Sequence, residues 1–370
     1  MESPMTADII SPSEISSELK RIWDSLEGTN KMRASLFNLV FYTKTGPRES
    51  YIRTISEKVV EKFPSRVIFI TENSDSSNDY LNTRVSVMSS TEEQSDIACD
   101  SIQIDVAGNH TERVPFVILP HILPDLPIYV IWADNPCAHS PLLDQLQKLA
   151  SRMIFDSESI DNLASFASKL VSLEEKQPFD IADLNWARTE SWRELLASAF
   201  YTDERLLMLR NATEIQICYN AHKSETFCHT PIQSIYLQGW LATQMGWDLQ
   251  NIDHNGDKWT LTYSHEGGTV TITLFPENHS SIKPGTIVSV DLETANHDHF
   301  SFGCNLDTPY LVSMRFSTLE KCDMPLKYIF GKEESGKSLV KEICHRGTSK
   351  HFFDLLNHLC DQKELTFCES

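Results

Sequence analysis

Hydrophobic residues in the first half of the chain follow two alternating patterns. Short apolar runs, such as 67–70 and 128–132, have the length of buried strands, and the segments between them carry apolar residues three and four positions apart, as helices do. The pattern predicts strands at 34–43, 66–71, 84–88, 101–106, 128–132 and 152–156, and helices at 15–26, 50–63, 112–122, 141–150 and 160–170. Residues 73–82 are polar and are expected to form a loop. Alternating strands and helices are typical of an α/β layer.

Strands predominate after residue 200. They are short, alternate apolar and polar residues, and are separated by Gly, Asn, Asp or Pro, which favours an antiparallel sheet. We expect strands at 212–219, 258–263, 269–274, 286–292, 299–304 and 310–316, and helices at 232–246, 338–344 and 350–359. The charged segment 174–180 is interpreted as a linker. The sequence thus predicts an α/β domain at 1–177, with a mixed sheet flanked by helices, and an α+β domain at 178–370 with a mainly antiparallel sheet.

The second domain is expected to begin with a single helix at 183–200 that is rich in Trp and Arg. Helical spacing places Trp186, Trp192 and Arg193 on one face. A guanidinium in such a place needs either a carboxylate or carbonyl oxygen, with Glu190 as the nearest candidate, or the face of an indole ring. Because Trp and Arg often anchor interfaces, Trp186, Arg188, Trp192 and Arg193 are candidates for partner-binding or interdomain contacts. An amphipathic helix packed on a sheet is the alternative.

Composition excludes several classes of partner. The 370 residues carry a formal net charge of −20, which repels nucleic acid and anionic membranes and favours a basic protein surface or a cationic ligand. Residues 1–19 lack the basic and apolar regions of a secretory signal, and no run approaches the roughly 18 apolar residues of a membrane span. Nine scattered cysteines without a Cys-x-x-Cys pair suit reduced thiols. A cytoplasmic protein is expected.

Residues 331–338 match the phosphate-binding pattern G-x-x-x-x-G-K-[ST]. Such a loop belongs to the first strand of a parallel sheet, whereas here only 32 residues follow Ser338, and two adjacent glutamates within the loop would repel phosphates. We therefore expect a surface loop followed by a helix that begins at Ser338.

A metal site is the other alternative that the sequence offers. His297 and His299 would share one face of a strand, near Asp291, but histidines in polar turns are commoner than metal sites. The nucleophile pattern G-x-S-x-G and the dinucleotide pattern G-x-G-x-x-G are both absent. The sequence therefore predicts no catalytic residue, cofactor or metal, and favours a binding or regulatory protein over an enzyme.

Four segments together resemble the glucose-6-phosphate dehydrogenase assembly protein family, OpcA. They are Arg-Ala-Ser-Leu-Phe-Asn-Leu-Val at 33–40, Leu-Pro-His-Ile-Leu-Pro-Asp-Leu-Pro-Ile at 119–128, Ser-Arg-Met-Ile-Phe-Asp-Ser at 151–157, and Asp-Leu-Asn-Trp-Ala-Arg-Thr-Glu-Ser-Trp-Arg-Glu-Leu-Leu-Ala at 183–197. The last segment is the most specific. The resemblance is strong from 33 to 200, weaker through the strand-rich half, and returns in the closing helices at 338–359.

The resemblance implies a non-catalytic factor that binds glucose-6-phosphate dehydrogenase, promotes its oligomeric assembly and raises its activity, at the entry to the oxidative pentose phosphate pathway. Two alternatives are kept. One is an enzyme of sugar-phosphate metabolism, such as a 6-phosphogluconolactonase-like hydrolase. The other is a scaffold for a different basic partner.

Overall fold

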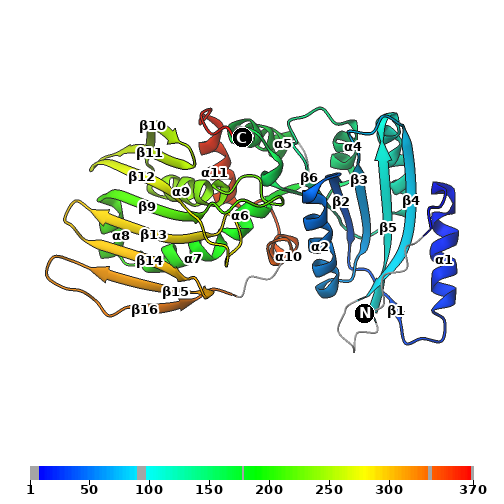
Figure 1. Cartoon of the computed structure of the whole chain (residues 1–370), viewed down its shortest axis with the longest axis horizontal. Helices are drawn as coiled ribbons and strands as arrows, with labels where there is room; N and C mark the ends of the chain where they lie inside the picture. The colour runs from blue at the N-terminus through cyan, green and yellow to red at the C-terminus, as the bar shows by residue number, and fades with distance from the viewer. Residues whose placement is uncertain (1–7, 90–96, 177–178, 332–335, 368–370) are drawn as a thin grey trace. The chain divides into compact units, whose positions relative to one another are not determined.

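The computed structural model of the chain describes residues 8–89, 97–176, 179–331 and 336–367 (Figure 1). These residues divide into two compact units. Unit 1 takes the described residues of Met1–Ile160, Ser172–Leu184 and Ser335–Thr348, and unit 2 those of Asp161–Val171, Asn185–Glu334 and Ser349–Ser370. Each unit is therefore discontinuous in sequence. The predicted domain boundary between 177 and 178 stays a prediction.

Unit 1 contains an eight-stranded sheet of order β1-β5-β3-β2-β6-β7-β8, with β4 paired to β5. Its strands are β1 Met32–Arg33, β2 Asn38–Lys44, β3 Arg66–Glu72, β4 Tyr80–Ser89, β5 Ile97–Ala107, β6 Ile128–Ala133, β7 Arg152–Phe155 and β8 Asp180–Asp183. Neighbours pair in parallel along that order, and β4 alone joins antiparallel. Most residues of β2, β3, β6 and β7 are buried, as the unbroken apolar runs predict. The α/β class with a mixed sheet is confirmed.

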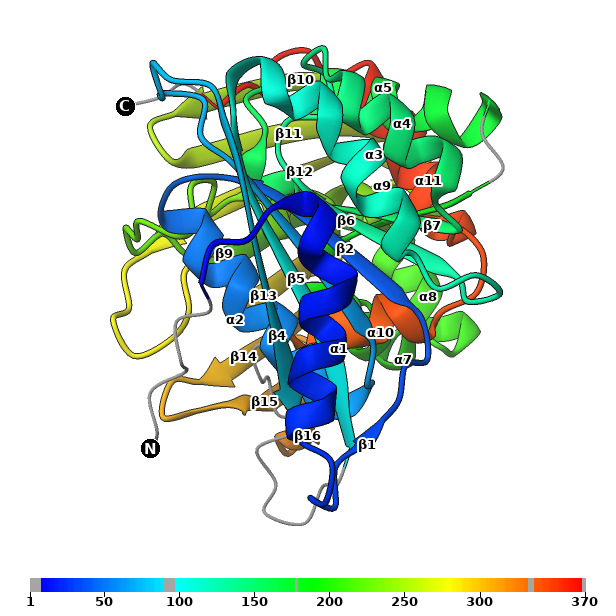
Figure 2. The same cartoon turned by 90° about the vertical axis from the view of Figure 1, so that its right-hand side faces the viewer.

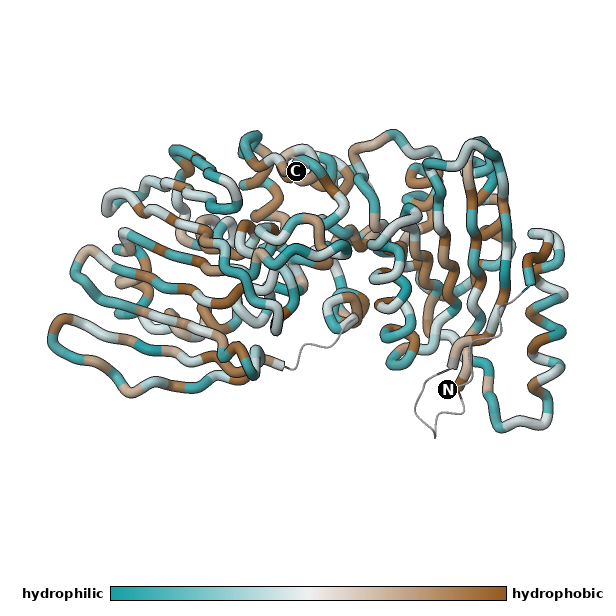
Figure 3. The backbone as a smooth tube through the Cα atoms, in the orientation of Figure 1, coloured by the Kyte–Doolittle hydropathy of each residue, from teal (hydrophilic) through white to brown (hydrophobic). Residues whose placement is uncertain are grey.

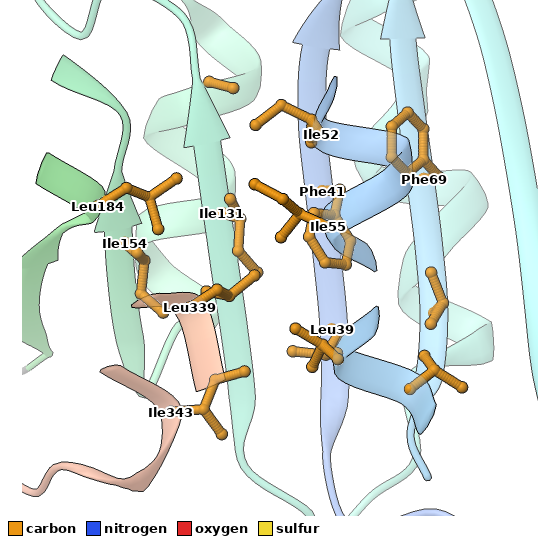
Figure 4. Packing of buried hydrophobic residues seen from close by; sticks show 14 of the residues in the cluster. Leu39, Phe41, Ile52, Ile55, Phe69, Ile131, Ile154, Leu184, Leu339 and Ile343 are labelled. Carbon is orange, nitrogen blue, oxygen red and sulfur yellow. The ribbon is translucent and has the colours of Figure 1, made fainter. Parts of the chain in front are cut away.

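Helices complete unit 1. They are α1 Ile15–Ser25, α2 Pro47–Lys62, α3 Val114–Ile118, α4 Pro141–Leu149 and α10 Lys337–Cys344, while α5 Leu163–Lys176 runs from unit 2 into unit 1. Helix α1 packs on β4 (Figure 2). Figure 4 shows the core in which Ile52 and Ile55 of α2 meet Leu39 and Phe41 of β2, together with Leu339 of α10. A helix near the end of the chain thus completes the core of its first half.

Unit 2 contains the second eight-stranded sheet, of order β10-β11-β12-β9-β13-β14-β15-β16. Its strands are β9 Ala212–Asn220, β10 Asp248–Asn255, β11 Lys258–His265, β12 Gly268–Glu277, β13 Ile287–Thr294, β14 His299–Asn305, β15 Thr308–Ser317 and β16 Leu326–Ile329. The pairing of β9 with β12 is parallel, and the other six pairings are antiparallel. Figure 3 shows the alternating hydropathy along these strands. The sheet is mixed, with antiparallel pairs in the majority.

The helices of unit 2 are α6 Leu184–Arg188, α7 Glu190–Ala199, α8 Asp203–Arg210, α9 Ile232–Met245 and α11 Lys350–Cys360. Helix α9 packs on β9 and β12, and α11 packs on α9. This layer explains the sheet's alternation, because the buried positions of β11 and β13 fall on every second residue.

Three predictions about elements were wrong. The helix expected at 112–122 is broken into the 3₁₀ turn η2 Gly108–Arg113, the short α3 and the 3₁₀ turn η3 Leu119–His121. Pro115 and Pro120 lack the N–H groups that a continuous helix needs. The loop predicted at 73–82 is too long, since β4 begins at Tyr80, and the linker predicted at 174–180 overlaps the end of α5 and the start of β8.

Candidate functional site

The segment predicted as one helix at 183–200 is wrong in extent. Asp183 ends β8, and the rest forms α6 and α7, which meet at Thr189. The Thr189 hydroxyl donates to the Trp186 carbonyl oxygen at 2.8 Å, and Thr189 occupies the N-cap position of α7. A threonine hydroxyl that bonds locally to the backbone competes with continuous helix geometry. The interruption therefore lies between the two tryptophans.

The Arg193 guanidinium lies on an indole face, as one of the two predicted alternatives required. Its Cζ is 3.3 Å from the ring centroid of Trp186. Its Nη2 donates to the Trp186 carbonyl at 3.1 Å and its Nε to the Thr189 hydroxyl at 3.2 Å. Arg193 thus ties α7 back to α6 by a cation–π contact and two hydrogen bonds.

The other predicted residues also have partners within unit 2. Arg188 donates to the Asn185 side-chain oxygen at 2.7 Å and lies over the ring of Phe227 at 5.4 Å. Trp186 packs against Phe352 of α11, with ring centroids 5.4 Å apart. Both tryptophans are buried, and Arg188 and Arg193 are half-buried. These contacts build the interior of unit 2; roles in partner binding or between domains stay predictions for all four predicted residues.

Trp192 connects the interior of unit 2 to the edge of its sheet through a series of aromatic contacts. Its ring meets Phe330 edge-on at 5.3 Å, and Phe330 meets Tyr328 of β16 edge-on at 5.9 Å. The Phe330 backbone N–H donates to the Tyr310 carbonyl on β15 at 2.7 Å. Edge-to-face aromatic pairs stabilise beyond the area they bury. Trp192 therefore supports the strand pair β15 and β16 from beneath.

The exposed apolar side chains of β15, β16 and the segment between them were not predicted. We define the β16 edge patch as Tyr310, Leu319, Met324, Leu326, Tyr328 and Ile329. Leu319, Met324 and Ile329 are 79%, 85% and 70% exposed. Leu319 and Met324 lie in the segment between β15 and β16, and the other four residues lie on the two strands. Single exposed apolar residues are common, but several within one strand pair and its connection make this a candidate site of association. No strand was predicted at 326–329, although its Leu-Lys-Tyr-Ile composition is suited to one.

The two edges of the unit 2 sheet differ in chemistry. At one edge, β10 carries Asp248 and Asp253, and charged side chains discourage pairing with another chain. At the other, all four residues of β16 are exposed and three of them are apolar (Figure 1). The β16 edge carries one charged side chain, that of Lys327, and among the described residues no strand pairs with its outer side, so it can accept a further strand beside its apolar side chains.

The histidines differ in geometry from a metal site, and the phosphate-loop match differs in its position in the sheet from a nucleotide site. His297 lies in a turn with φ 60°, so the predicted strand face shared with His299 is wrong. Both imidazoles contact Glu293, at 2.9 and 3.4 Å. Within the described ranges, no group of three or more His, Cys, Asp and Glu residues could hold a metal ion. In the phosphate-loop match, 332–335 lie outside the described residues, and the preceding β16 is an antiparallel edge strand.

Two further observations concern chain chemistry. Burial of the Cys99 side chain raises the pKa of its thiol to about 11. Among the described residues, no helix combines the length and the apolar composition of a membrane span.

Comparison with solved structures identifies the fold. A levoglucosan dehydrogenase, solved in complex with NADH and levoglucosan, matches with a TM-score of 0.52 and 9% identity over 90% of this chain and 96% of that one. The transcriptional regulator Gal80p from Kluyveromyces lactis matches with a TM-score of 0.50 and 10% identity over 93% and 97%. One neighbour is an enzyme and the other a regulator, so this fold does not decide between the two classes.

Comparison with related sequences identifies the family. Proteins described as OxPP cycle protein OpcA match from Synechococcus elongatus, at 26% identity over 57% of this chain and 47% of the relative, and from Synechocystis sp., at 34% over 41% and 30%. The chain spans less than half the length of these relatives. Family models for the glucose-6-phosphate dehydrogenase subunit match at 56–172 for its N-terminal domain and at 180–321 for its C-terminal domain. The chain therefore belongs to the OpcA family of glucose-6-phosphate dehydrogenase subunits.

Proposed function

We propose that this chain is a non-catalytic assembly factor and allosteric activator of glucose-6-phosphate dehydrogenase, acting in the cytoplasm at the entry to the oxidative pentose phosphate pathway. The observation that carries the proposal is the match of both domains of the dehydrogenase-subunit family. The relatives' description as OxPP cycle proteins supports the same pathway.

The β16 edge patch is the docking surface in this proposal. A strand of the dehydrogenase adds to the outer edge of β16, and its apolar side chains cover Leu326 and Ile329. Main-chain hydrogen bonds supply affinity in such additions, and side-chain pockets supply specificity. Trp192 and Phe330 hold the strand from beneath, while Trp186, Arg188 and Arg193 hold α6 and α7 in place.

Activation requires a difference in affinity. The factor raises dehydrogenase activity only if it binds the more active oligomer more tightly than other states. A tenfold preference corresponds to about 1.4 kcal/mol and shifts the equilibrium between the two states tenfold at saturation. Binding of equal strength to all states would leave the activity unchanged.

The test is a titration of the purified chain into its cognate dehydrogenase. The NADP⁺ reduction rate and the particle mass, measured by light scattering, are expected to rise together and to saturate at the same ratio of chain to dehydrogenase. The proposal fails if mass and rate both stay at their starting values.

The same protein is assayed for turnover of 6-phosphogluconolactone. The proposal expects a hydrolysis rate equal to that of buffer. Hydrolysis in proportion to protein concentration, with no effect on the dehydrogenase, would favour the hydrolase alternative instead.

A further inference from the structure

The unit 1 sheet contains a topological switch point, which is the place where doubly wound sheets bind ligands. The chain goes from β2 to β3 on one side of β2 and later returns to β6 on its other side. In such sheets a dinucleotide binds outside the carboxyl ends of the strands at this switch point, with its phosphates at the amino end of the first helix. That helix is α2, which begins at Pro47 after Gly46.

Two cationic side chains near this switch point, those of Arg48 and Lys44, already form ion pairs with carboxylates of the same chain. Arg48, in the first turn of α2, donates from Nε and Nη2 to the two oxygens of Asp156, both at 2.7 Å. The Asp156 side chain is fully buried and that of Arg48 is 11% exposed. Lys44, the last residue of β2, pairs with Asp134 at 3.0 Å. A bidentate, desolvated pair such as Arg48 and Asp156 is strongly held.

Further carboxylates lie at the ends of neighbouring strands. Glu72, which ends β3, accepts a hydrogen bond from the Tyr42 hydroxyl. Asp183, which ends β8, accepts from the backbone N–H and the hydroxyl of Ser157 at 3.0 and 3.1 Å. Together with Asp134 and Asp156, four strand ends thus present four carboxylates. Lys44 and Arg48 neutralise Asp134 and Asp156, so the charges of Glu72 and Asp183 leave this edge negative, which repels a pyrophosphate.

The remaining donors do not fit a dinucleotide. The turn from β2 to α2 has the single glycine Gly46, whereas the dinucleotide turn needs glycines so that its backbone can approach the phosphates. Among the described residues here, the buried indole N–H of Trp132 lacks an acceptor. Its ring is stacked on that of Tyr42, its register partner on β2, with the ring centroids 3.8 Å apart. One indole donor does not hold a pyrophosphate.

We infer that this crevice is closed to dinucleotides because the Asp156 carboxylate occupies Arg48 in place of a ligand phosphate. At the place where this fold binds ligands, the chain has an internal ion pair that joins α2 to the end of β7. The inference stands independently of docking to the dehydrogenase, since it concerns unit 1 alone.

The first test uses the wild-type chain. NADPH is titrated against it while nicotinamide fluorescence and the midpoint of thermal unfolding are followed, and inorganic phosphate is titrated in the same way. We expect no saturable change with either ligand. Saturable NADPH binding at micromolar concentration would overturn the inference without any variant.

The second test removes the internal carboxylate. Asp156→Ser removes the bidentate carboxylate partner of Arg48, so we expect a lower unfolding midpoint that inorganic phosphate raises saturably by several degrees. The double variant Arg48→Ala/Asp156→Ser should lose this recovery, and Glu18→Ala, which breaks an exposed Arg–Glu pair, should show none. If phosphate shifts Asp156→Ser no more than it shifts the double variant, the carboxylate does not stand in for a ligand anion.

Discussion

Arg193 and Trp186 show how two residues with opposite solvation demands stabilise each other. The guanidinium covers the indole face while its N–H groups bond the Trp186 carbonyl and the Thr189 hydroxyl. A half-buried cation thus keeps its hydrogen bonds, and an exposed indole face is removed from water. Local spacing in the sequence predicted that Arg193 needs a carboxylate, a carbonyl or an indole face, but it did not choose among them, and it offered Glu190 as the nearest candidate.

Trp192 is a residue whose loss should affect both stability and docking. Trp192→Ala removes a buried ring from beneath Phe330, and we expect a loss of about 3–5 kcal/mol in unfolding free energy together with weaker binding to the dehydrogenase. Trp192→Phe keeps an aromatic contact and should lose less of both. Urea unfolding and the titration described above measure the two effects. Tyr201→Ala, at an 83% exposed position of the same unit, is the control and should change stability by under about 0.5 kcal/mol.

His358 makes the stability of unit 2 depend on pH. Burial lowers the pKa of His358 in the folded chain, against a smaller opposing effect of Asp361. In the unfolded chain the imidazole titrates near ~6.5, so on acidification the unfolded state takes up the proton first. Stability should therefore be greatest above that pH and should fall as the pH drops through 6.5 toward the folded pKa.

Chemical unfolding at pH 7.5 and 5.5 measures this slope. His358→Gln should flatten it, while His351→Gln, at an exposed position of α11, should retain it. A slope unchanged in His358→Gln would contradict the assignment. Some slope should remain, because burial and the charge of Arg66 lower the pKa of His121 as well.

Ion pairs between residues far apart in the chain could not be predicted from the sequence. Arg48 and Asp156 are 108 positions apart, and neither lies in a motif that names the other. Residue 156 does fall in one of the segments that resemble the family, but that resemblance assigns it no chemistry. The closed crevice in unit 1 became visible only when the fold brought the strand ends together.

Among the elements, the buried strands were the easiest to predict and the edge strands the hardest. Strands β3 and β6 are short apolar runs bounded by polar residues, so pattern and structure agree. Strand β10 is almost wholly polar and β16 is wholly exposed, so neither has the alternation that identifies a half-buried strand. These segments form strands because they lie at the edges of the sheet, and that position depends on the rest of the sheet.

The β16 edge gives the sharpest test of the docking proposal. Ile329→Lys places a charge on an exposed strand residue, and we expect at least a tenfold loss of affinity for the dehydrogenase with under about 0.5 kcal/mol change in unfolding free energy. Isothermal calorimetry and urea unfolding measure the two quantities. Asn251→Lys, an exposed position on the opposite edge strand β10, is the matched control and should bind normally. Equal affinity of Ile329→Lys and wild type would exclude β16 as the docking surface.

At the scale of the whole molecule, the two fold classes were predictable but their interleaving was not. The change from strand–helix alternation to consecutive strands marks two kinds of layer. The closing helices α10 and α11 look alike as amphipathic segments, yet Leu339 belongs to unit 1 and Phe352 to unit 2. Which of the two cores the apolar face of a helix packs into depends on the shape of that core. The periodicity of apolar residues in the sequence carries no information about this choice.

Removing the closing segment should therefore unfold both units. A chain ended after Gly331 loses Leu339, Ile343, Phe352 and Leu355, all buried. At about 1.5–3 kcal/mol for each buried side chain, the two residues lost from each unit cost that unit about 3–6 kcal/mol, a large part of the whole stability of a domain. Calorimetry should show no cooperative transition, and limited proteolysis should cleave within both units. A chain ended after Phe367 should melt as the wild type does; a normal transition in the shorter chain would refute the argument.

The position of α10 also has a consequence for synthesis on the ribosome. Ile52 and Ile55 emerge early, but Leu339 and Ile343, which share their core, are made some 280 residues later. At translation rates of 5–20 residues per second, the nascent chain carries this uncovered apolar surface for roughly 15–60 s. The core of the first unit therefore cannot be completed until residues 337–344 have been made. A holding chaperone has that interval in which to bind the outer face of α2.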